Sequence, residues 1–272
     1  AICKLNMFLH GVRGADIRKG DTLGDPQHVE NGELMRFDRV IANPPFSLKK
    51  WGRDLAEDDG YGRYRFGLPP KDAGDLAFVQ HMIASLNNEG VMGVVVPHGV
   101  LFRGSSEGEI RKGILESDLL EAVIGLPSAL FYGTGIPAAL LIINKQKDSN
   151  KKGKVLFINA ELNYQEGKNQ NILRDLDIEK IVNCFDAYEE IKRFSKVISL
   201  KEIRENDHNL NIRRYADTSP PPENFDVKGI LHGGIPIKEI QDDYIKEVLN
   251  GFDVGLVLVN KDDEYMMFKE EV

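Results

Sequence analysis

The sequence predicts an α/β fold in which helices cover a central sheet. Two observations support this prediction. Short, nearly continuous apolar runs recur along the chain, and segments with apolar residues at helical spacing lie between them. Strands that are apolar on both alternations suit a sheet buried on both faces. Strands separated by helices of this length indicate parallel strands in a layered arrangement.

Five apolar runs are predicted as strands. The first three run into proline, which cannot donate a hydrogen bond to a neighbouring strand and therefore marks a strand end. In chain order the five runs are 39–42, 91–96, 120–126, 138–143 and 155–158.

Three helices are predicted in the same region. Apolar residues recur at helical spacing from Leu76 to Leu86, with Asp72 as the expected N-cap. Ser106 and Glu109 form a capping-box pattern at the start of the second helix. The third is expected over about 178–194.

Charge is distributed unevenly along the chain. The 272 residues carry 35 Lys and Arg against 43 Asp and Glu, a net charge of −8. The region 219–272 holds 12 acidic and 5 basic residues, hence −7 of that total. It begins with Ser-Pro-Pro-Pro, a stiff run suited to a linker. We therefore expect a main domain over 1–218 and an acidic extension over 219–272, with a helix and a hairpin.

Composition excludes several classes of protein. The acidic balance argues against a protein that coats polyanions generally. Two cysteines, Cys3 and Cys184, are too few for a disulfide framework or a zinc cluster, and no histidines pair at metal-ligand spacing, so we expect no metal. No apolar run is long enough to span a membrane. The first residues lack the cationic start of a signal peptide, so a reducing, cytoplasmic location is expected.

The most informative segment is the turn Asn43-Pro44-Pro45-Phe46, which follows an apolar strand. Two prolines force the chain out of the sheet at the carboxyl end of the strand, where ligands bind in open α/β sheets. The Asn43 side chain and a nearby peptide carbonyl offer two acceptors for an amino group, and Phe46 offers a surface for stacking. The pattern predicts a site for a planar substrate that carries NH2. The alternative is a structural turn with an Asn cap and a core Phe.

Further segments extend this pattern along the chain. In order they are 37–47, 74–81, 96–102, 110–111, 122–127, 130–137 and 209–215. Together they resemble the modification subunit of type I restriction–modification systems. These subunits are amino-group methyltransferases dependent on S-adenosylmethionine, with the hallmark (Asp/Asn/Ser)-Pro-Pro-aromatic. The resemblance covers roughly 1–217, and 130–137 and 209–215 are its most specific parts.

The resemblance implies N6-methylation of adenine in DNA, on a base flipped out of the duplex. It implies that Asn43 and the carbonyl of Pro44 accept hydrogen bonds from the adenine amino group. Phe46 would stack on the base. Phe131 would form the opposite wall of the base pocket, with Tyr132 as the competing choice.

The resemblance also implies S-adenosylmethionine as the cofactor, bound on a Rossmann-like sheet. Asp21 matches the acidic residue that meets the cofactor's adenine, Asn43 lies beside the cofactor, and Phe78 either helps to line that pocket or is core. The family's glycine-rich loop and its ribose-binding Glu have no counterpart here. We therefore expect 1–218 to be the C-terminal portion of a methyltransferase domain with an incomplete cofactor site. We expect residues 1–272 alone to be inactive and to self-associate through the strand around Val40.

A group of basic residues interleaved with aromatic ones follows the turn. Its members singled out for DNA contact are Lys49, Lys50, Arg53, Arg63 and Arg65. We expect a mobile loop that grips phosphates beside the base pocket. The alternative is a solvated surface loop of mixed charge.

The family resemblance implies three partners: DNA, a specificity subunit that selects the sequence, and a motor–nuclease subunit that joins for restriction. Two alternatives remain. Asn-Pro-Pro also suits a glutamine amide, so a protein glutamine or RNA methyltransferase is the first. The second is a catalytically inactive fragment that acts only as a DNA-contacting or assembly module.

Overall fold

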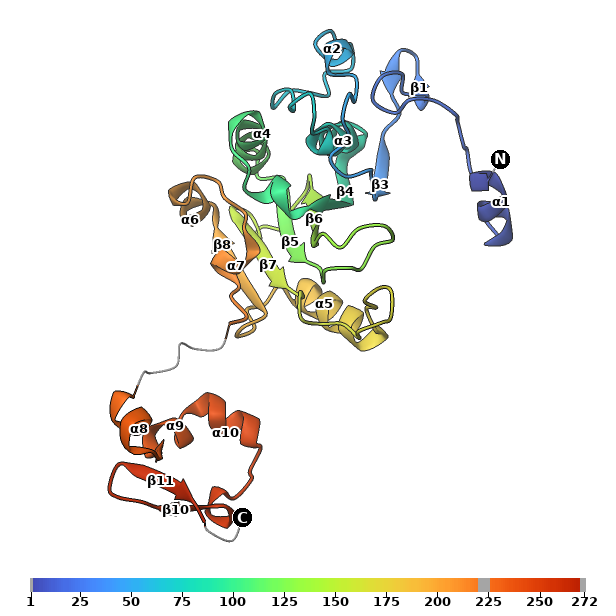
Figure 1. Cartoon of the computed structure of the whole chain (residues 1–272). Helices are drawn as coiled ribbons and strands as arrows, with labels where there is room; N and C mark the ends of the chain where they lie inside the picture. Colours follow the sequence, from blue (N-terminus) through green and yellow to red (C-terminus); the bar gives the residue numbers. More distant parts are fainter. Residues whose placement is uncertain (1, 220–225, 270–272) are drawn as a thin grey trace. The chain divides into compact units, whose positions relative to one another are not determined.

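The computed structural model describes residues 2–219 and 226–269. The chain forms two compact units, Ala1–Thr218 and Ser219–Val272, each considered separately below. Figure 1 traces both units along the chain. No helix among the described residues is both long and apolar enough to cross a membrane.

The first unit is built on a six-stranded sheet with the order β3-β4-β6-β5-β7-β8. Its strands are β3 (Phe37–Ala42), β4 (Leu86–Pro97), β5 (Leu120–Gly125), β6 (Ala138–Asn144), β7 (Lys154–Asn159) and β8 (Ser195–Ser199). The predicted α/β class is confirmed, and each of the five predicted strands is present.

The expectation of a parallel sheet is wrong. β3, β4, β5 and β7 share one direction, whereas β6 and β8 run the opposite way. The reason lies in the connections. A loop without a helix, 126–137, joins β5 to β6, and such a short return produces an antiparallel neighbour. An apolar run has the same composition whether its strand is parallel or antiparallel, so the sequence pattern could not reveal strand direction.

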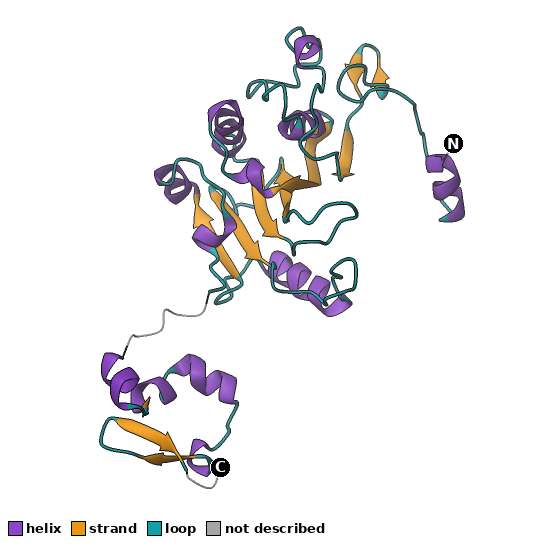
Figure 2. Ribbon diagram, viewed as in Figure 1, coloured by secondary structure: helices purple, strands orange, loops and turns teal. Residues whose placement is uncertain are grey.

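Helices cover the two faces of this sheet unequally, as Figure 2 shows. On one face, α3 (Asp75–Ala84) and α4 (Ser105–Glu116) enclose the larger core cluster with α6 (Leu200–Glu205) and α7 (Ile212–Tyr215). On the other, α5 (Asp175–Ala187) packs against β5 and β7. No described helix covers that second face over β3, and Ile41 there is 87% exposed.

Three helix predictions need correction in detail. α3 begins after Gly74, so Asp72 is not its cap, and Leu86 already belongs to β4. α4 begins after Gly104 with no side-chain cap, so the capping box at Ser106 is wrong. α5 ends where Tyr188 takes a left-handed conformation, well before 194, and β8 follows instead.

Short elements complete the first unit. They are α1 (Ile2–Leu9), β1 (Val29–Glu30), β2 (Glu33–Leu34), α2 (Arg53–Ala56) and η1 (His98–Leu101).

The second unit is a small α/β assembly around a three-stranded sheet with the order β10-β11-β9. Its elements are α8 (Val227–His232), β9 (Ile235–Pro236), α9 (Ile237–Ile240), α10 (Asp243–Leu249), η2 (Val254–Leu256), β10 (Leu258–Asn260) and β11 (Tyr265–Phe268). The predicted hairpin is present as β10 and β11, although residues 254–256 form a turn of 3₁₀ helix. The Tyr265 hydroxyl donates to Asp226 over 2.6 Å and fastens the hairpin to the start of α8.

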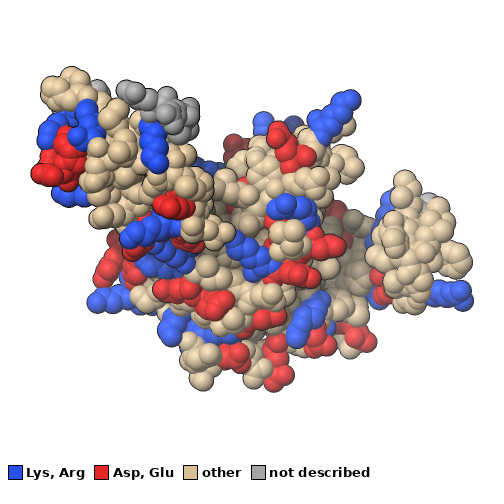
Figure 3. All heavy atoms as spheres, turned by 90° about the horizontal axis from the view of Figure 1, so that it is seen from below, with Lys and Arg blue, Asp and Glu red and all other residues tan. Residues whose placement is uncertain are grey.

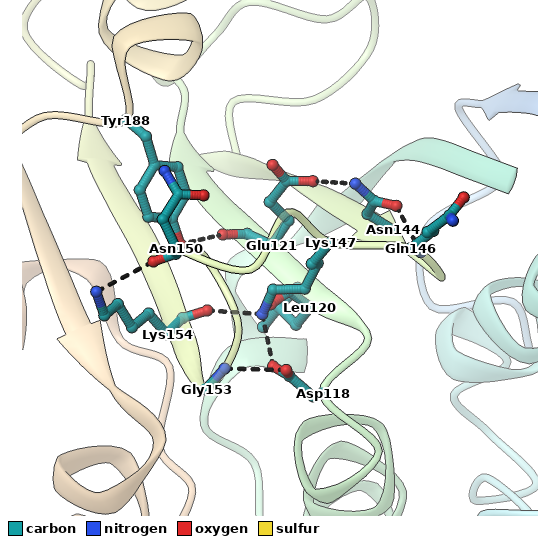
Figure 4. Close-up of polar contacts among 10 residues, drawn as sticks. All are labelled: Asp118, Leu120, Glu121, Asn144, Gln146, Lys147, Asn150, Gly153, Lys154 and Tyr188. Carbon is teal, nitrogen blue, oxygen red and sulfur yellow. Dashed lines mark hydrogen bonds and ion pairs between the residues drawn. The ribbon is translucent and has the colours of Figure 1, made fainter. Parts of the chain in front are cut away.

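A buried polar network holds β5, β6 and β7 together at the edge where β5 begins (Figure 4). The Lys147 side chain is 2% exposed, and its ammonium donates to Asp118 over 2.6 Å and to the carbonyls of Leu120 and Lys154 over 3.1 and 2.7 Å. Beside it, buried Glu121 accepts from Lys151 over 2.8 Å. Every hydrogen of the Lys147 ammonium therefore has a partner, which offsets the cost of burying the charge.

We expect Lys147→Met to lower the free energy of unfolding by about 3 kcal/mol, because it removes the buried cation that pairs with half-buried Asp118 and donates to two carbonyls. Urea denaturation of the purified chain measures this change. Lys152→Met is the matched control, since Lys152 is exposed in the same loop between β6 and β7 and should change stability by less than about 0.5 kcal/mol. Equal effects of the two substitutions would show that the network contributes nothing.

Candidate active site

The carboxyl ends of β3, β4, β5 and β7 lie along one edge of the sheet, because these strands run in the same direction. The Asn43 turn leaves β3 at this edge, and the loop 126–137 leaves β5 there. β4 and β6 separate the two strands. Segments more than 80 residues apart in sequence therefore meet at the edge where ligands bind in open α/β sheets.

Phe46 and Phe131 come together at this edge. Their ring centroids are 6.3 Å apart with an interplanar angle of 79°, an edge-to-face contact. Both rings are half-buried, and Phe131 also packs on the core cluster that includes Leu126. Tyr132 is 90% exposed and packs against neither of the two core clusters of the sheet. Of the two aromatic residues considered for the opposite wall, only Phe131 contacts Phe46.

The predicted Asn43 turn is presented to solvent. Asn43 and Pro45 are exposed, whereas Pro44 and Phe46 are half-buried. No described hydrogen bond or ion pair engages the Asn43 side chain, so its amide oxygen is available as an acceptor. An amide oxygen followed by two prolines and an aromatic ring can hold and stack a planar amine.

A residue that the sequence analysis missed fastens this turn. Asp75, the first residue of α3, is buried, and its Oδ1 accepts a hydrogen bond from the backbone N–H of Ser47 over 2.8 Å. An acidic residue in the first turn of a helix is common, because it complements the helix dipole. Because an acidic residue at this position is so common, the sequence pattern did not single out the contact between Asp75 and Ser47. Only the burial of the Asp75 carboxylate in the structure distinguishes it.

Asp21 and Phe78 lie near a small satellite cluster of Leu23, Trp51, Ala56 and Ala77. Asp21 is exposed, and its Oδ1 accepts from the N–H of Leu23 over 3.1 Å. Phe78 is half-buried against the cluster that contains Leu23. Both residues therefore border the same cluster, Asp21 through the Leu23 amide and Phe78 through its ring, and a carboxylate and an aromatic ring are groups that could hold the adenine end of a nucleoside cofactor. Among the described residues, no group of three His, Cys, Asp or Glu side chains could hold a metal ion.

The basic residues after the turn differ in their exposure and in the contacts that they make. Lys49 and Lys50 are exposed, and neither ammonium has a partner among the described residues. Arg53 donates to the carbonyl of Pro69 and pairs with Glu57, while Arg65 is exposed and lies over its neighbour Phe66. Figure 3 shows basic and acidic side chains interspersed over one face of the molecule.

Contrary to the expectation, Arg63 is not placed to contact DNA. Its side chain is buried, pairs with Asp59 over 2.8 Å, and donates to the carbonyls of Thr22 and Leu23. All of these hydrogen-bond partners lie within the fold, so the Arg63 guanidinium stabilises the structure and is not available to phosphates. The segment 49–71 also differs from the expected mobile loop. It packs around Trp51, which is buried and donates to the carbonyl of Pro70 over 2.7 Å.

Burial and the nearby Arg63 together lower the pKa of a neighbouring histidine, His81. The Arg63 Nη1 lies 3.3 Å from His81 Nδ1. Burial, and secondly the positive charge of Arg63, lower the pKa of His81 to about 4, with Asp59 opposing the shift. His81 is therefore neutral at pH 7 and can accept from Arg63, which agrees with a structural role.

Comparison with known proteins shows what the chain is similar to. It matches the N-6 DNA Methylase family over residues 1–224. The type I restriction enzyme MjaVII methylase subunit of Methanocaldococcus jannaschii is 38% identical over 267 residues, which cover 94% of this chain and 45% of the relative. The HindI methylase subunit of Haemophilus influenzae is 35% identical over 231 residues, 79% of this chain and 50% of the relative.

A solved structure agrees with these relatives. The methyltransferase subunit of a type I restriction–modification system from Streptococcus thermophilus superposes with a TM-score of 0.73 at 40% identity, over 80% of this chain and 46% of that chain. The chain therefore spans about half the length of the proteins it matches.

The His81 environment predicts a stability that depends on pH. A histidine whose pKa is lowered from 6.5 to about 4 on folding contributes stability above pH 6.5 that is lost as the pH falls towards 4. We expect the parent chain to lose about 2 kcal/mol more than His81→Gln between pH 7.5 and pH 5, as measured by urea denaturation. His10→Gln, at an exposed site, should behave as the parent. Identical losses in all three proteins would contradict this linkage.

Proposed function

The chain belongs to the N-6 DNA methylase family, and on that premise we propose that it serves the transfer of a methyl group from S-adenosylmethionine to the N6 atom of adenine in DNA. The enzyme would be the modification subunit of a type I restriction–modification system; the relatives cited above are named methylase or methyltransferase subunits of such systems. One observation carries the proposal. The exposed Asn43 turn and the Phe46–Phe131 pair meet at the carboxyl edge of the sheet.

The turn suits an exocyclic amine. The Asn43 amide oxygen and the Pro44 carbonyl would accept the two amino hydrogens and orient the nitrogen lone pair. The bound cofactor would supply a methyl group activated by its sulfonium sulfur. Asn43 and the carbonyl would stabilise the positive charge that develops on the amino nitrogen, which then releases one proton. Neither a metal nor a covalent link to the protein is required.

The two aromatic residues suit an extrahelical base. Phe46 would stack on the flipped adenine, and Phe131 would close the pocket from the loop 126–137. An adenine ring stacked on Phe46, in place of the present edge-to-face contact with Phe131, would replace the stacking that the base loses on leaving the duplex. We assign the second wall to Phe131 because it contacts Phe46, whereas Tyr132 is directed to solvent.

Cofactor and DNA contacts follow from the same arrangement. Asp21 would hold the adenine end of S-adenosylmethionine, and Phe78, which borders the same cluster, would help to line that pocket. Lys49 and Lys50, with Arg53 and Arg65 in support, would contact phosphates near the turn. A specificity subunit would select the sequence, and a motor–nuclease subunit would join for restriction.

Asn43→Ala should lower the single-turnover rate of methyl transfer by about 10²–10³-fold, because one well-oriented polar group is lost from the site. The assay uses unmethylated DNA and tritiated S-adenosylmethionine. The enzyme is the full-length protein in its native complex with the partner subunits. Chromatography of the digested nucleosides should place the label in N6-methyladenine. Asn88→Ala is the matched control, since Asn88 is exposed near the start of β4. Label found only in tRNA or protein acceptors, or a rate within a few fold of the parent, would refute the assignment.

Phe46→Ala and Phe131→Ala should each weaken capture of the extrahelical base by about 5- to 150-fold, as expected for 1–3 kcal/mol of stacking. Fluorescence of 2-aminopurine at the target position, in the same complex, reports this step. Binding to duplex DNA should change far less. Tyr132→Ala should leave the signal unchanged, and the opposite order of the Phe131 and Tyr132 effects would exchange their roles.

A further inference from the structure

The exit of the Asn43 turn is fastened to the segment that leads into α3. Three bonds join the two stretches: the Ser47 N–H donates to Asp75 Oδ1 over 2.8 Å, the Gly74 N–H to the Leu48 carbonyl over 3.1 Å, and the Lys50 N–H to the Lys71 carbonyl over 3.1 Å. Only the first uses a side chain. It is also the bond nearest to Phe46, so it fixes the point where the turn ends.

Within the part of the chain that the structure describes, the Asp75 carboxylate makes only one long ion pair, and its shortest contact is the hydrogen bond from Ser47. It is 2% exposed, and its Oδ2 has no hydrogen-bond partner among the described residues. The nearest cation is Arg103, whose Nη1 lies 3.9 Å from that oxygen. The same nitrogen lies 3.2 Å from both oxygens of Glu107, another buried carboxylate. Arg103 is therefore committed mainly to Glu107, and the short contact of Asp75 is with Ser47.

The backbone at Ser47 needs such a restraint. Its φ of 50° lies in the left-handed region, which non-glycine residues seldom adopt. A conformation of this kind persists only where surrounding contacts determine it, and it is found at functional sites. A hydrogen bond to a carboxylate is roughly twice as strong as one to a neutral acceptor, which suits this task.

We propose that Asp75 is a positioning residue for the methyl-transfer site: through the Ser47 amide it fixes the direction in which the turn carries Asn43 and Phe46. The inference rests on the proposed function and adds a residue to the same site. Asp75 does not touch the substrate. Its effect comes from geometry, because a displacement of about 1 Å in a reacting group can cost about 10²-fold in rate.

The test compares Asp75→Ala, Asp75→Asn and the control Asp72→Ala in the native complex. Asp75→Ala should lower kcat by about 10²-fold, while the dissociation constants for S-adenosylmethionine and for duplex DNA change less than about threefold. Asp75→Asn keeps an acceptor of the same shape, so it should restore kcat to within about tenfold of the parent. Asp72 is exposed three residues earlier, and its substitution should have no effect.

Hydrogen exchange of the Ser47 amide gives a readout that does not depend on activity. Protection should be lost in Asp75→Ala and largely kept in Asp75→Asn. Lost protection with unchanged kcat would overturn the positioning role while the proposed function stands. Absence of methyl transfer in the parent, with the exchange pattern as expected, would instead sink the proposed function.

A second variant guards against the case in which Asp75→Ala does not fold. Replacing the Ser47 amide by an ester, through semisynthesis, removes the donor and leaves Asp75 in place. It should lower kcat to about the same extent as Asp75→Ala. A parent-like kcat in the ester variant would overturn the proposal.

Discussion

The insertion of β6 between β4 and β5 is the constraint on which the rest of the site depends. β6 pairs antiparallel with both neighbours, so β5 runs in the same direction as β3 and β4. The turn after β3 and the loop after β5 therefore leave the sheet at one edge. The loop runs from β5 to β6, which lies one strand nearer to β3, and so carries Phe131 towards Phe46. The aromatic pair is thus a consequence of strand order.

Much of this could be predicted from sequence, and the failures have physical causes. The strands and the Asn43 turn were evident because apolar runs and prolines act locally. Strand direction was not, since a buried strand reads alike in either direction. β8 was missed because Ser-Lys-Val-Ile-Ser is too polar to stand out at the edge of a sheet. The site residues were indicated largely by family resemblance, and their roles stay predictions.

Buried charge escaped prediction for a related reason. Arg63 and Lys147 stand among exposed basic residues in sequence, and only their folded surroundings show that each is enclosed and fully partnered. Arg63 joins the 59–63 turn to Leu23, and Lys147 joins three strands. Both are inward-facing cations that tie a loop to the scaffold, so a basic cluster in sequence is not by itself a phosphate-binding surface.

Contacts outside the sheet fasten the end of the Asn43 turn. The Ser47 N–H donates to Asp75 Oδ1 over 2.8 Å, and Asp75 is 2% exposed at the start of α3. The backbone at Ser47 is left-handed, with a φ of 50°, and such a conformation persists only where surrounding contacts determine it. The exposed Asn43 amide precedes Phe46 in the chain and the restrained Ser47 amide follows it. The same short turn therefore presents a polar group to solvent at one end and is anchored to the buried start of a helix at the other.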